Sequence, residues 1–320
     1  MLKNLIGIDL GGTTTKMAFL NEEGEVLDKW RILTDISDNG SHIVENIIES
    51  INKHIEEAGK TKADFIGIGM GTPGAVNSER GTVSEAYNLN WVDEQPIRQL
   101  IQDGIGLPFD LDNDANVASL GEYWKGAGSA EADVVFATLG TGVGGGVIAN
   151  GKLIHGVNGG AGEIGHITVE PRGYQCTCGK QGCLETYASA TGIVRLAEDM
   201  TKDFRGTSRL KELINGDEKV TSKLVFYLAD NGDILANQVV DRVCFYLGLA
   251  LSMIGNTFNP ASIIIGGGVS NAGNTLLQPT TKYFQENAFS SVRDSTKIKL
   301  AELGNDAGVI GAASMALQFK

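Results

Sequence analysis

Three glycine clusters, each directly after a short apolar segment that predicts a β-strand, constrain this chain more than any other sequence feature. They are Gly11-Gly12 followed by Thr13 and Thr14, Gly140-Thr141-Gly142, and Gly266-Gly267-Gly268. The chain has 43 glycines among 320 residues, about twice the usual share of roughly 7%. Glycine at a strand end permits a tight turn whose backbone N–H groups can approach a phosphate. The clusters therefore favour a nucleotide-binding protein.

The spacing of these glycines matches neither the Walker P-loop nor the dinucleotide-binding G-x-G-x-x-G pattern. One such turn is usually only a tight hairpin, but three of them at strand ends favour a site for phosphates. Asp9 ends the first predicted strand, where it either caps the turn or holds Mg²⁺ against the phosphates. Lys16 could touch a phosphate, but we expect a solvated lysine at a strand end.

The first part of the chain predicts alternating strands and helices. Strands are expected at 5–10 and 16–20, around the first glycine cluster, and a buried strand at 65–69. Apolar residues recur with a helical period from 41 to 58, and helical sequence follows Asp114.

The pattern of strand, glycine turn and strand returns later in the chain. A strand is expected at 134–139, a turn at 140–146 and a second strand at 147–149, and a strand at 262–265 follows a buried helix near 243–258. Two copies of one motif favour duplicated domains that face each other across a cleft. Glycine hairpins are also common, so chance recurrence is the alternative.

We therefore expect an α/β protein of two domains. A small N-terminal α/β domain is predicted at 1–118, and the helical tail at 306–320 is expected to pack back on it. A large C-terminal α/β domain is predicted at 119–305.

Composition excludes several classes of protein. The chain has 26 Lys and Arg against 39 Asp and Glu, a net charge of -13, which opposes binding to nucleic acid. No export signal precedes the first predicted strand, and the longest apolar run, 243–254, is shorter than the roughly 20 residues that span a bilayer. We expect a cytoplasmic protein with no membrane partner.

Two carboxylates and two amides lie close together in Asp112-Asn113-Asp114-Ala115-Asn116. One of these side chains is expected to cap the following helix. Another carboxylate could act as a general base on a substrate hydroxyl. Spacing alone leaves both roles open.

His166, Cys176, Cys178 and Cys183 form a complete tetrahedral ligand set for Zn²⁺. A disulfide is disfavoured in a reducing cytoplasm, and neighbouring glycines allow the chain to wrap around an ion. Because the protein fills all four positions, the predicted zinc is structural. Cys244 lies in an apolar helix and is expected in the core.

Glu163, His166 and Glu185 bracket this cluster. They are either solvated or second-layer groups around the metal, or they face a ligand with many hydroxyls. His42 and His54 are expected on a helix surface, and His155 is given no role.

Taken together, these motifs resemble the ROK family of sugar kinases and repressors, and most closely its bacterial glucokinase branch. The resemblance rests on Asp9-x-Gly11-Gly12-Thr13, Asp112-Asn113-Asp114-Ala115-Asn116, the glycine run from Gly140, Glu163-x-Gly165-His166, and Cys176-x-Cys178 through Cys183-x-Glu185. The motifs are in order over nearly the whole chain. The cysteine cluster is the most specific of them, and the glycine turns alone indicate only the wider actin-like ATPase superfamily.

The resemblance implies a ribonuclease-H-like fold with hexose and Mg-ATP in the interdomain cleft, and transfer of phosphate from ATP to the 6-hydroxyl of glucose. It implies Asp114 as the general base and a sugar site of Gly74, Asn113, Asp114, Glu163, His166 and Glu185, with His166 serving metal and sugar. It implies that ATP binds Asp9, Gly11, Gly12, Thr13, Thr14, Gly140, Thr141 and Gly142, with Gly267 and Gly268 under the adenosine. A homodimer or homotetramer is expected.

Other functions remain as alternatives. The substrate could be N-acetylmannosamine, N-acetylglucosamine or fructose in place of glucose. A ROK repressor carries a helix-turn-helix domain before the first glycine turn. We do not expect a repressor here, because Asp9 is the ninth residue of this sequence and its net charge opposes DNA. An actin-like ATPase with a chaperone or assembly role would need neither the Asn113-Asp114 pair nor the cysteine cluster.

Overall fold

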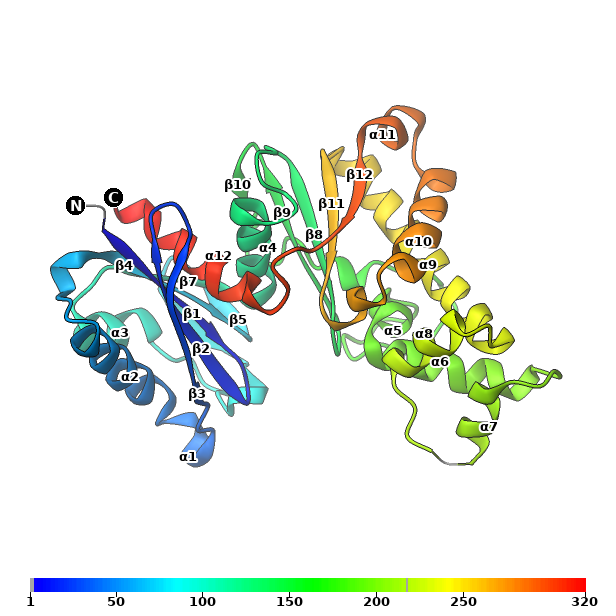
Figure 1. Cartoon of the computed structure of the whole chain (residues 1–320), viewed down its shortest axis with the longest axis horizontal. Coiled ribbons are helices and arrows are strands. Elements are labelled where there is room, and N and C mark those ends of the chain that lie inside the picture. Colours follow the sequence, from blue (N-terminus) through cyan, green and yellow to red (C-terminus); the bar gives the residue numbers. More distant parts are fainter. Residues whose placement is uncertain (1–2, 217) are drawn as a thin grey trace. The chain divides into compact units, whose positions relative to one another are not determined.

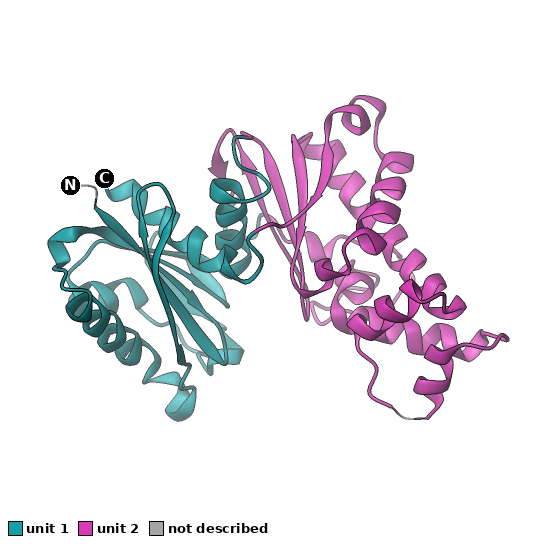
Figure 2. Cartoon of the chain, in the orientation of Figure 1, with its two compact units in different colours: residues 1–130, 155–161, 303–320 teal, residues 131–154, 162–302 magenta. Residues whose placement is uncertain are grey.

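Two five-stranded sheets, one in each of two units, organise the computed structural model, which describes residues 3–216 and 218–320. Unit 1 contains the described residues up to Ala130, together with His155–Ala161 and Leu303–Lys320 (Figure 2). Unit 2 contains Glu131–Ile154 and Gly162–Glu302. The predicted boundary at 118/119 falls inside helix α4 (Asp114–Lys125), which lies wholly in unit 1.

The sheet of unit 1 has the order β3-β2-β1-β4-β7. Its strands β1 to β3 are antiparallel, whereas β4 and β7 run parallel to β1. The strands are β1 (Asn4–Leu10), β2 (Thr14–Asn21), β3 (Val26–Leu33), β4 (Phe65–Thr72) and β7 (Phe109–Asn113), and the short pair β5 (Ala75–Asn77) and β6 (Thr82–Ser84) lies outside this sheet.

Helices cover both faces of this sheet (Figure 1). One hydrophobic cluster joins the sheet to α2 (Ile43–Glu57) and α3 (Ile97–Ile105), whose isoleucines recur at helical spacing. Another joins it to α12 (Ala307–Met315), so the C-terminal tail packs on the first half of the chain as predicted. The short α1 spans Ser37–Gly40.

The sheet of unit 2 has the order β10-β9-β8-β11-β12 and the same pattern of directions. Its strands are β8 (Val134–Leu139), β9 (Val143–Ala149), β10 (Lys152–Leu153), β11 (Ser262–Gly266) and β12 (Lys297–Leu300). Its helices are α5 (Glu185–Ala188), α6 (Ala190–Asp203), α7 (Arg209–Asn215), α8 (Ser222–Asp230), α9 (Ile234–Phe258), α10 (Asn274–Asn287) and α11 (Ser290–Ser295). The two sheets are therefore copies of one topology, which is the duplication that the repeated glycine hairpin indicates.

One predicted turn is shorter than expected. Strand β9 begins at Val143, so Gly144 to Gly146 are strand residues and not part of a turn at 140–146. A Cβ on Gly145 would lie 2.6 Å from the side chain of Ile164. Glycine here allows the segment around Ile164 to pack directly on the strand.

Helix α9 has the length and the composition of a membrane span. The expectation that the apolar run at 243–254 is too short to cross a bilayer was therefore wrong, because the helix that contains it is longer than the run. Its buried residues belong to the main core of unit 2, and 61% of its most apolar window is buried in the structure. This burial is typical of the central helix of a globular core.

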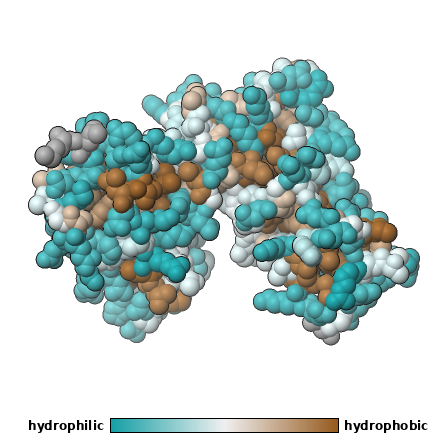
Figure 3. Space-filling view, in the orientation of Figure 1, coloured by the Kyte–Doolittle hydropathy of each residue, from teal (hydrophilic) through white to brown (hydrophobic). Residues whose placement is uncertain are grey.

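Most of the face shown in Figure 3 is hydrophilic, with smaller hydrophobic areas between the hydrophilic ones.

Glycines bring α12 very close to its neighbours in unit 1. A Cβ on Gly311 would overlap the carbonyl oxygen of Val117 in α4, and one on Gly7 would overlap the carbonyl oxygen of Val309. Because backbone cannot move aside as a flexible side chain can, these contacts require glycine. They fix α12 against both α4 and β1.

We predict that Gly311→Ala lowers the free energy of unfolding by about 3 kcal/mol, at the upper end of the usual cost of overpacking. Gly216→Ala is the control, since Gly216 has a φ of −89° and the nearest atom to an added Cβ is 3.2 Å away. It should change stability by less than about 1 kcal/mol. Urea denaturation measures both variants, and equal midpoints would contradict the packing argument.

Candidate functional site

The predicted ligand residues of unit 1 lie at one edge of its sheet. Parallel pairing places Asp9 beside Gly71, and Gly71 beside Asp112, so the carboxyl ends of β1, β4 and β7 coincide there. The first glycine turn follows β1 and is closed by Gly11 N–H, which donates to the carbonyl oxygen of Thr14 at 3.1 Å. Gly74 follows β4 with a φ of +99°, which favours glycine at this position.

Asp9 is paired with Lys16 across β1 and β2. The Lys16 Nζ lies 3.1 Å from Asp9 Oδ2 and donates to the carbonyl oxygen of Asn305 at 3.0 Å. The expectation that Lys16 is merely solvated was therefore wrong, because its ammonium group has two protein partners. The carboxylate of Asp9 is the oxygen donor type that Mg²⁺ prefers, and it lies beside the glycine turn.

The three side chains of Asp112, Asn113 and Asp114 lie in different environments. Asn113 is the N-cap of α4, and its side-chain oxygen accepts a hydrogen bond from Ala115 N–H at 3.0 Å. Asp112 is buried, with 4% of its surface exposed. Asp114 is the first residue of α4 and is exposed. Of the two carboxylates, only that of Asp114 is therefore exposed to receive a proton from a substrate.

The second and third glycine clusters lie together in unit 2. β8 and β11 are parallel and pair Thr138 with Gly266, so both clusters lie at the carboxyl end of their strands. Gly267 has a φ of +81°, and a Cβ there would lie 2.5 Å from the Leu139 carbonyl oxygen. The second turn is tied to α6 by Thr191 Oγ1, which donates to the Thr141 carbonyl oxygen at 2.9 Å.

A cavity of about 350 Å³ opens beside the second turn. Sequence reasoning identified part of its lining but missed several polar residues. Gln175 and Thr177 flank Cys176 within the cysteine motif, and Thr191 and Arg195 come from α6, which has no motif of its own.

The four predicted zinc ligands come together in unit 2, on the segment 166–185, which we call the zinc loop. Their ligand atoms all lie within 4.8 Å of one another. The Sγ atoms of Cys178 and Cys183 are 3.6 Å apart, and Cys176 Sγ is 3.7 Å from His166 Nδ1. A disulfide needs about 2.05 Å between sulfurs, whereas tetrahedral zinc with bonds near 2.3 Å to sulfur fits these separations. The donor set is thus suited to zinc.

Two of the three candidate sugar residues of unit 2, His166 and Glu185, are the first and last residues of the zinc loop, and Glu163 lies just before it. The other ring nitrogen of His166, Nε2, lies 3.9 Å from Glu163 Oε2. Glu185 Oε2 accepts a hydrogen bond from Val143 N–H at 3.1 Å, beside the second glycine turn. The Nδ1 of His166 is therefore directed to the metal position, while Nε2 faces away from it.

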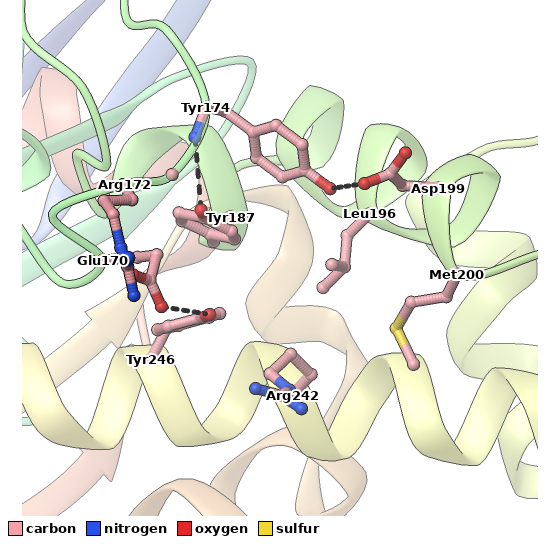
Figure 4. Close-up of a pocket in the computed structure, with 10 residues that line it drawn as sticks. Glu170, Arg172, Tyr174, Tyr187, Leu196, Asp199, Met200, Arg242 and Tyr246 are labelled. Atoms are coloured by element: carbon pink, nitrogen blue, oxygen red, sulfur yellow. Dashed lines mark hydrogen bonds between the residues drawn. The ribbon is translucent and has the colours of Figure 1, made fainter. Parts of the chain in front are cut away.

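Three tyrosines, Tyr174 within the zinc loop, Tyr187 in α5 and Tyr246 in α9, lie close together (Figure 4). Tyr174 donates through its hydroxyl to Asp199 at 2.9 Å, and Tyr246 donates to Glu170 at 3.4 Å. Tyr187 lies between them, with ring centroids 4.9 Å from Tyr174 and 4.2 Å from Tyr246. The part of the loop before its cysteines is thereby held against α6 through Asp199 and against α9 through Tyr246.

The comparisons with known proteins identify the family. A family model described as the ROK family matches residues 5–319. The chain belongs to the ROK family. It is 48% identical to the glucokinase of Halalkalibacterium halodurans over 314 residues, which cover 98% of this chain and 94% of that protein. It is 31% identical to the xylose repressor of Caldicellulosiruptor bescii over 98% of this chain and 78% of the repressor.

A solved structure of the ROK family has the same fold. The ROK family glucokinase from Streptomyces griseus, in complex with glucose and AMPPNP, is similar with a TM-score of 0.76 and 34% identity, over 98% of this chain and 99% of that one. The two mixed α/β sheets of this ROK protein match that structure. The predicted two-domain α/β fold of the actin-like ATPase superfamily is confirmed.

We predict that the purified ROK protein binds one zinc ion per chain, and that Cys178→Ala removes it because three ligands hold zinc less tightly than four. Cys244→Ala is the matched control, since burial raises the pKa of the Cys244 thiol to about 12 and keeps it protonated. Metal analysis after gel filtration measures the content. Equal zinc in the two variants would contradict the assignment.

Proposed function

We propose that this ROK protein is a glucokinase that transfers the γ-phosphoryl group of ATP to the 6-hydroxyl of glucose. The observation that carries the proposal is the exposed carboxylate of Asp114, at the start of α4 and directly after the buried Asp112. The similarity to glucokinases over nearly the whole chain supports glucose as the substrate.

In the proposed reaction, Asp114 accepts the proton of the 6-hydroxyl as its oxygen attacks the γ-phosphorus. The bond from oxygen 6 to phosphorus forms, the bond from phosphorus to the bridging oxygen breaks, and ADP leaves. Side chains of Asn113, Glu163, His166 and Glu185 bind the other hydroxyls, and Gly74 offers backbone. Phosphoryl transfer depends mainly on such positioning and on charge stabilisation.

Backbone N–H groups are proposed to bind the phosphates, since the chain as a whole is strongly acidic. Gly11, Gly12, Thr13, Thr14 and Gly140 to Gly142 would surround them, with Gly267 and Gly268 under the adenosine. When bound, Mg²⁺ supplies positive charge to the phosphates, and Asp9 is the carboxylate that fits it. Lys16 adds a further positive charge at Asp9.

Zinc is proposed to be structural. His166, Cys176, Cys178 and Cys183 would hold it and leave no open position for a substrate. Its contribution is to fix the zinc loop, so that His166 Nε2 and the Glu185 carboxylate have a defined place. We further propose that the enzyme works in the cytoplasm as a homodimer or homotetramer.

Two alternatives follow from the same site. The preferred sugar could be N-acetylmannosamine, N-acetylglucosamine or fructose, and the similarity to xylose repressors leaves a sugar-sensing regulator as a more distant candidate. A coupled assay of ADP release across these sugars tests all of them. Phosphorylation of glucose with the highest kcat/KM supports the proposal, and no sugar-dependent release of ADP would contradict it.

We predict that Asp114→Asn lowers kcat by about 10²–10⁴-fold, the usual contribution of a general base, while glucose still binds because the amide keeps hydrogen-bonding capacity. Asp103→Asn, at an exposed carboxylate on α3, should leave kcat unchanged. Steady-state kinetics and calorimetric titration with glucose measure the two effects. A near-wild-type kcat for Asp114→Asn would refute the assignment.

A further inference from the structure

One short segment leaves unit 2 and packs into unit 1. The chain passes from Ile154 in unit 2 to His155–Ala161 in unit 1, and returns to unit 2 at Gly162. The first residue of this segment, His155, places Nε2 at 2.5 Å from Asp112 Oδ2. Sequence reasoning gave His155 no role.

We propose that His155 is a positioning residue that acts through Asp112: it fixes Asn113 and Asp114 at the end of β7 and holds the His155–Ala161 segment on unit 1. This inference rests on the proposed function for its kinetic consequences. Its structural part, that His155 orders these two segments, stands without that function.

Asp112 connects His155 to the proposed catalytic segment. The Oδ1 atom accepts from Asn113 N–H at 2.7 Å and from the Asn116 side-chain amide at 2.9 Å, while Oδ2 faces His155. The residues directly before and within the first turn of α4 are thus bonded to one carboxylate. Because Asp112 is buried, a missing donor leaves part of its charge uncompensated and favours rearrangement of these neighbours.

The segment also passes near β5, the strand that follows Gly74. A Cβ added to Gly159 would lie 3.6 Å from the carbonyl oxygen of Val76 in β5, two residues after Gly74. Ala161 N–H donates to the carbonyl oxygen of His155 at 3.0 Å, which closes the segment on itself. His155 therefore starts a folded segment that is bonded to Asp112 in β7 and passes near β5 at Gly159.

A second histidine–aspartate pair shows what distinguishes this one. His42 Nε2 lies 3.3 Å from Asp38 Oδ2, and its side chain is 43% exposed, close to the 40% of His155. The carboxylates differ, since the side chain of Asp38 is 80% exposed and the side chain of Asp112 only 6%. Water can replace His42 at Asp38, but it cannot easily replace His155 at Asp112.

Protonation should strengthen the pair. The hydrogen bond to Asp112 raises the pKa of His155, the charges of Asp112 and Asp110 act in the same direction, and burial opposes them. A raised pKa means that the interaction is complete below the ordinary value near 6.5 and is lost as the pH rises through the folded value. The positions of Asn113 and Asp114 should therefore become less well fixed as the pH rises through the folded pKa of His155.

The experiment compares the wild type with His155→Ala, His155→Gln and the matched control His42→Ala. His155→Ala should lower kcat by about 10- to 100-fold, the equivalent of a hydrogen bond to a charged group. His155→Gln retains an amide donor near the position of Nε2, so it should recover most of kcat at neutral pH. In the wild type, kcat should fall as the pH rises above the ordinary histidine pKa. This fall should be absent in His155→Gln, which does not titrate, and His42→Ala should show the same pH profile as the wild type.

Amide hydrogen exchange provides a readout that needs no activity. His155→Ala should exchange faster than the wild type at 113–116 and at 155–161, and His42→Ala should not. Wild-type kcat in His155→Ala, an equal loss in His42→Ala, or unchanged exchange in both segments would overturn the inference. If His155→Ala does not fold, a pH profile of His155→Gln identical to that of the wild type would overturn it.

The two proposals can fail separately. If the wild type does not phosphorylate glucose, the proposed function is wrong, and hydrogen exchange still decides whether His155 orders the two segments. If the wild type phosphorylates glucose and His155→Ala has unchanged kinetics and exchange, only the role of His155 is wrong.

Discussion

Parallel pairing of the central strands is the constraint on which the rest of this structure depends. In unit 1 it places Asp9, Gly71 and Asp112 in adjacent register, and in unit 2 it places Thr138 beside Gly266. Residues that are far apart in the sequence therefore share one edge of each sheet. Ligands commonly bind at the carboxyl edge of parallel strands in α/β proteins. Each glycine cluster lies at such an edge.

Burial then separates groups that look alike in sequence. Asp112 and Asp114 are two positions apart, yet one is buried among hydrogen-bond donors and the other is exposed at a helix start. The cysteines divide in the same way. Three of them lie within reach of one metal ion with His166, whereas Cys244 is enclosed by the core of unit 2. The sequence alone contains several carboxylates and thiols that could serve as bases or ligands. Their burial and their neighbours in the fold distinguish them.

Features that depend on residues close together in the sequence could be predicted from the sequence. The strands around both glycine hairpins, the helix with isoleucines at 43, 47, 51 and 55, and the zinc ligands all follow from short-range pattern. Hydrogen-bonded pairs of side chains that are far apart in the sequence could not be predicted in this way. His155 was left without a partner because Asp112 lies 43 positions away. The extent of β9 was missed for the same reason, since Ile164 is what requires glycine in that strand. Lys16 has a second partner, Asn305, 289 positions away, but its first partner, Asp9, faces it across the first hairpin and was missed although it is near in sequence.

The central claim is that Asp114 accepts the proton of the sugar 6-hydroxyl. A crystal structure with glucose and a non-hydrolysable ATP analogue tests it most directly. The account predicts a carboxylate oxygen of Asp114 within about 2.6–3.2 Å of oxygen 6, the range of a general base and its proton, with that oxygen facing the γ-phosphorus. A sugar bound with oxygen 6 away from Asp114 and toward another side chain would contradict it.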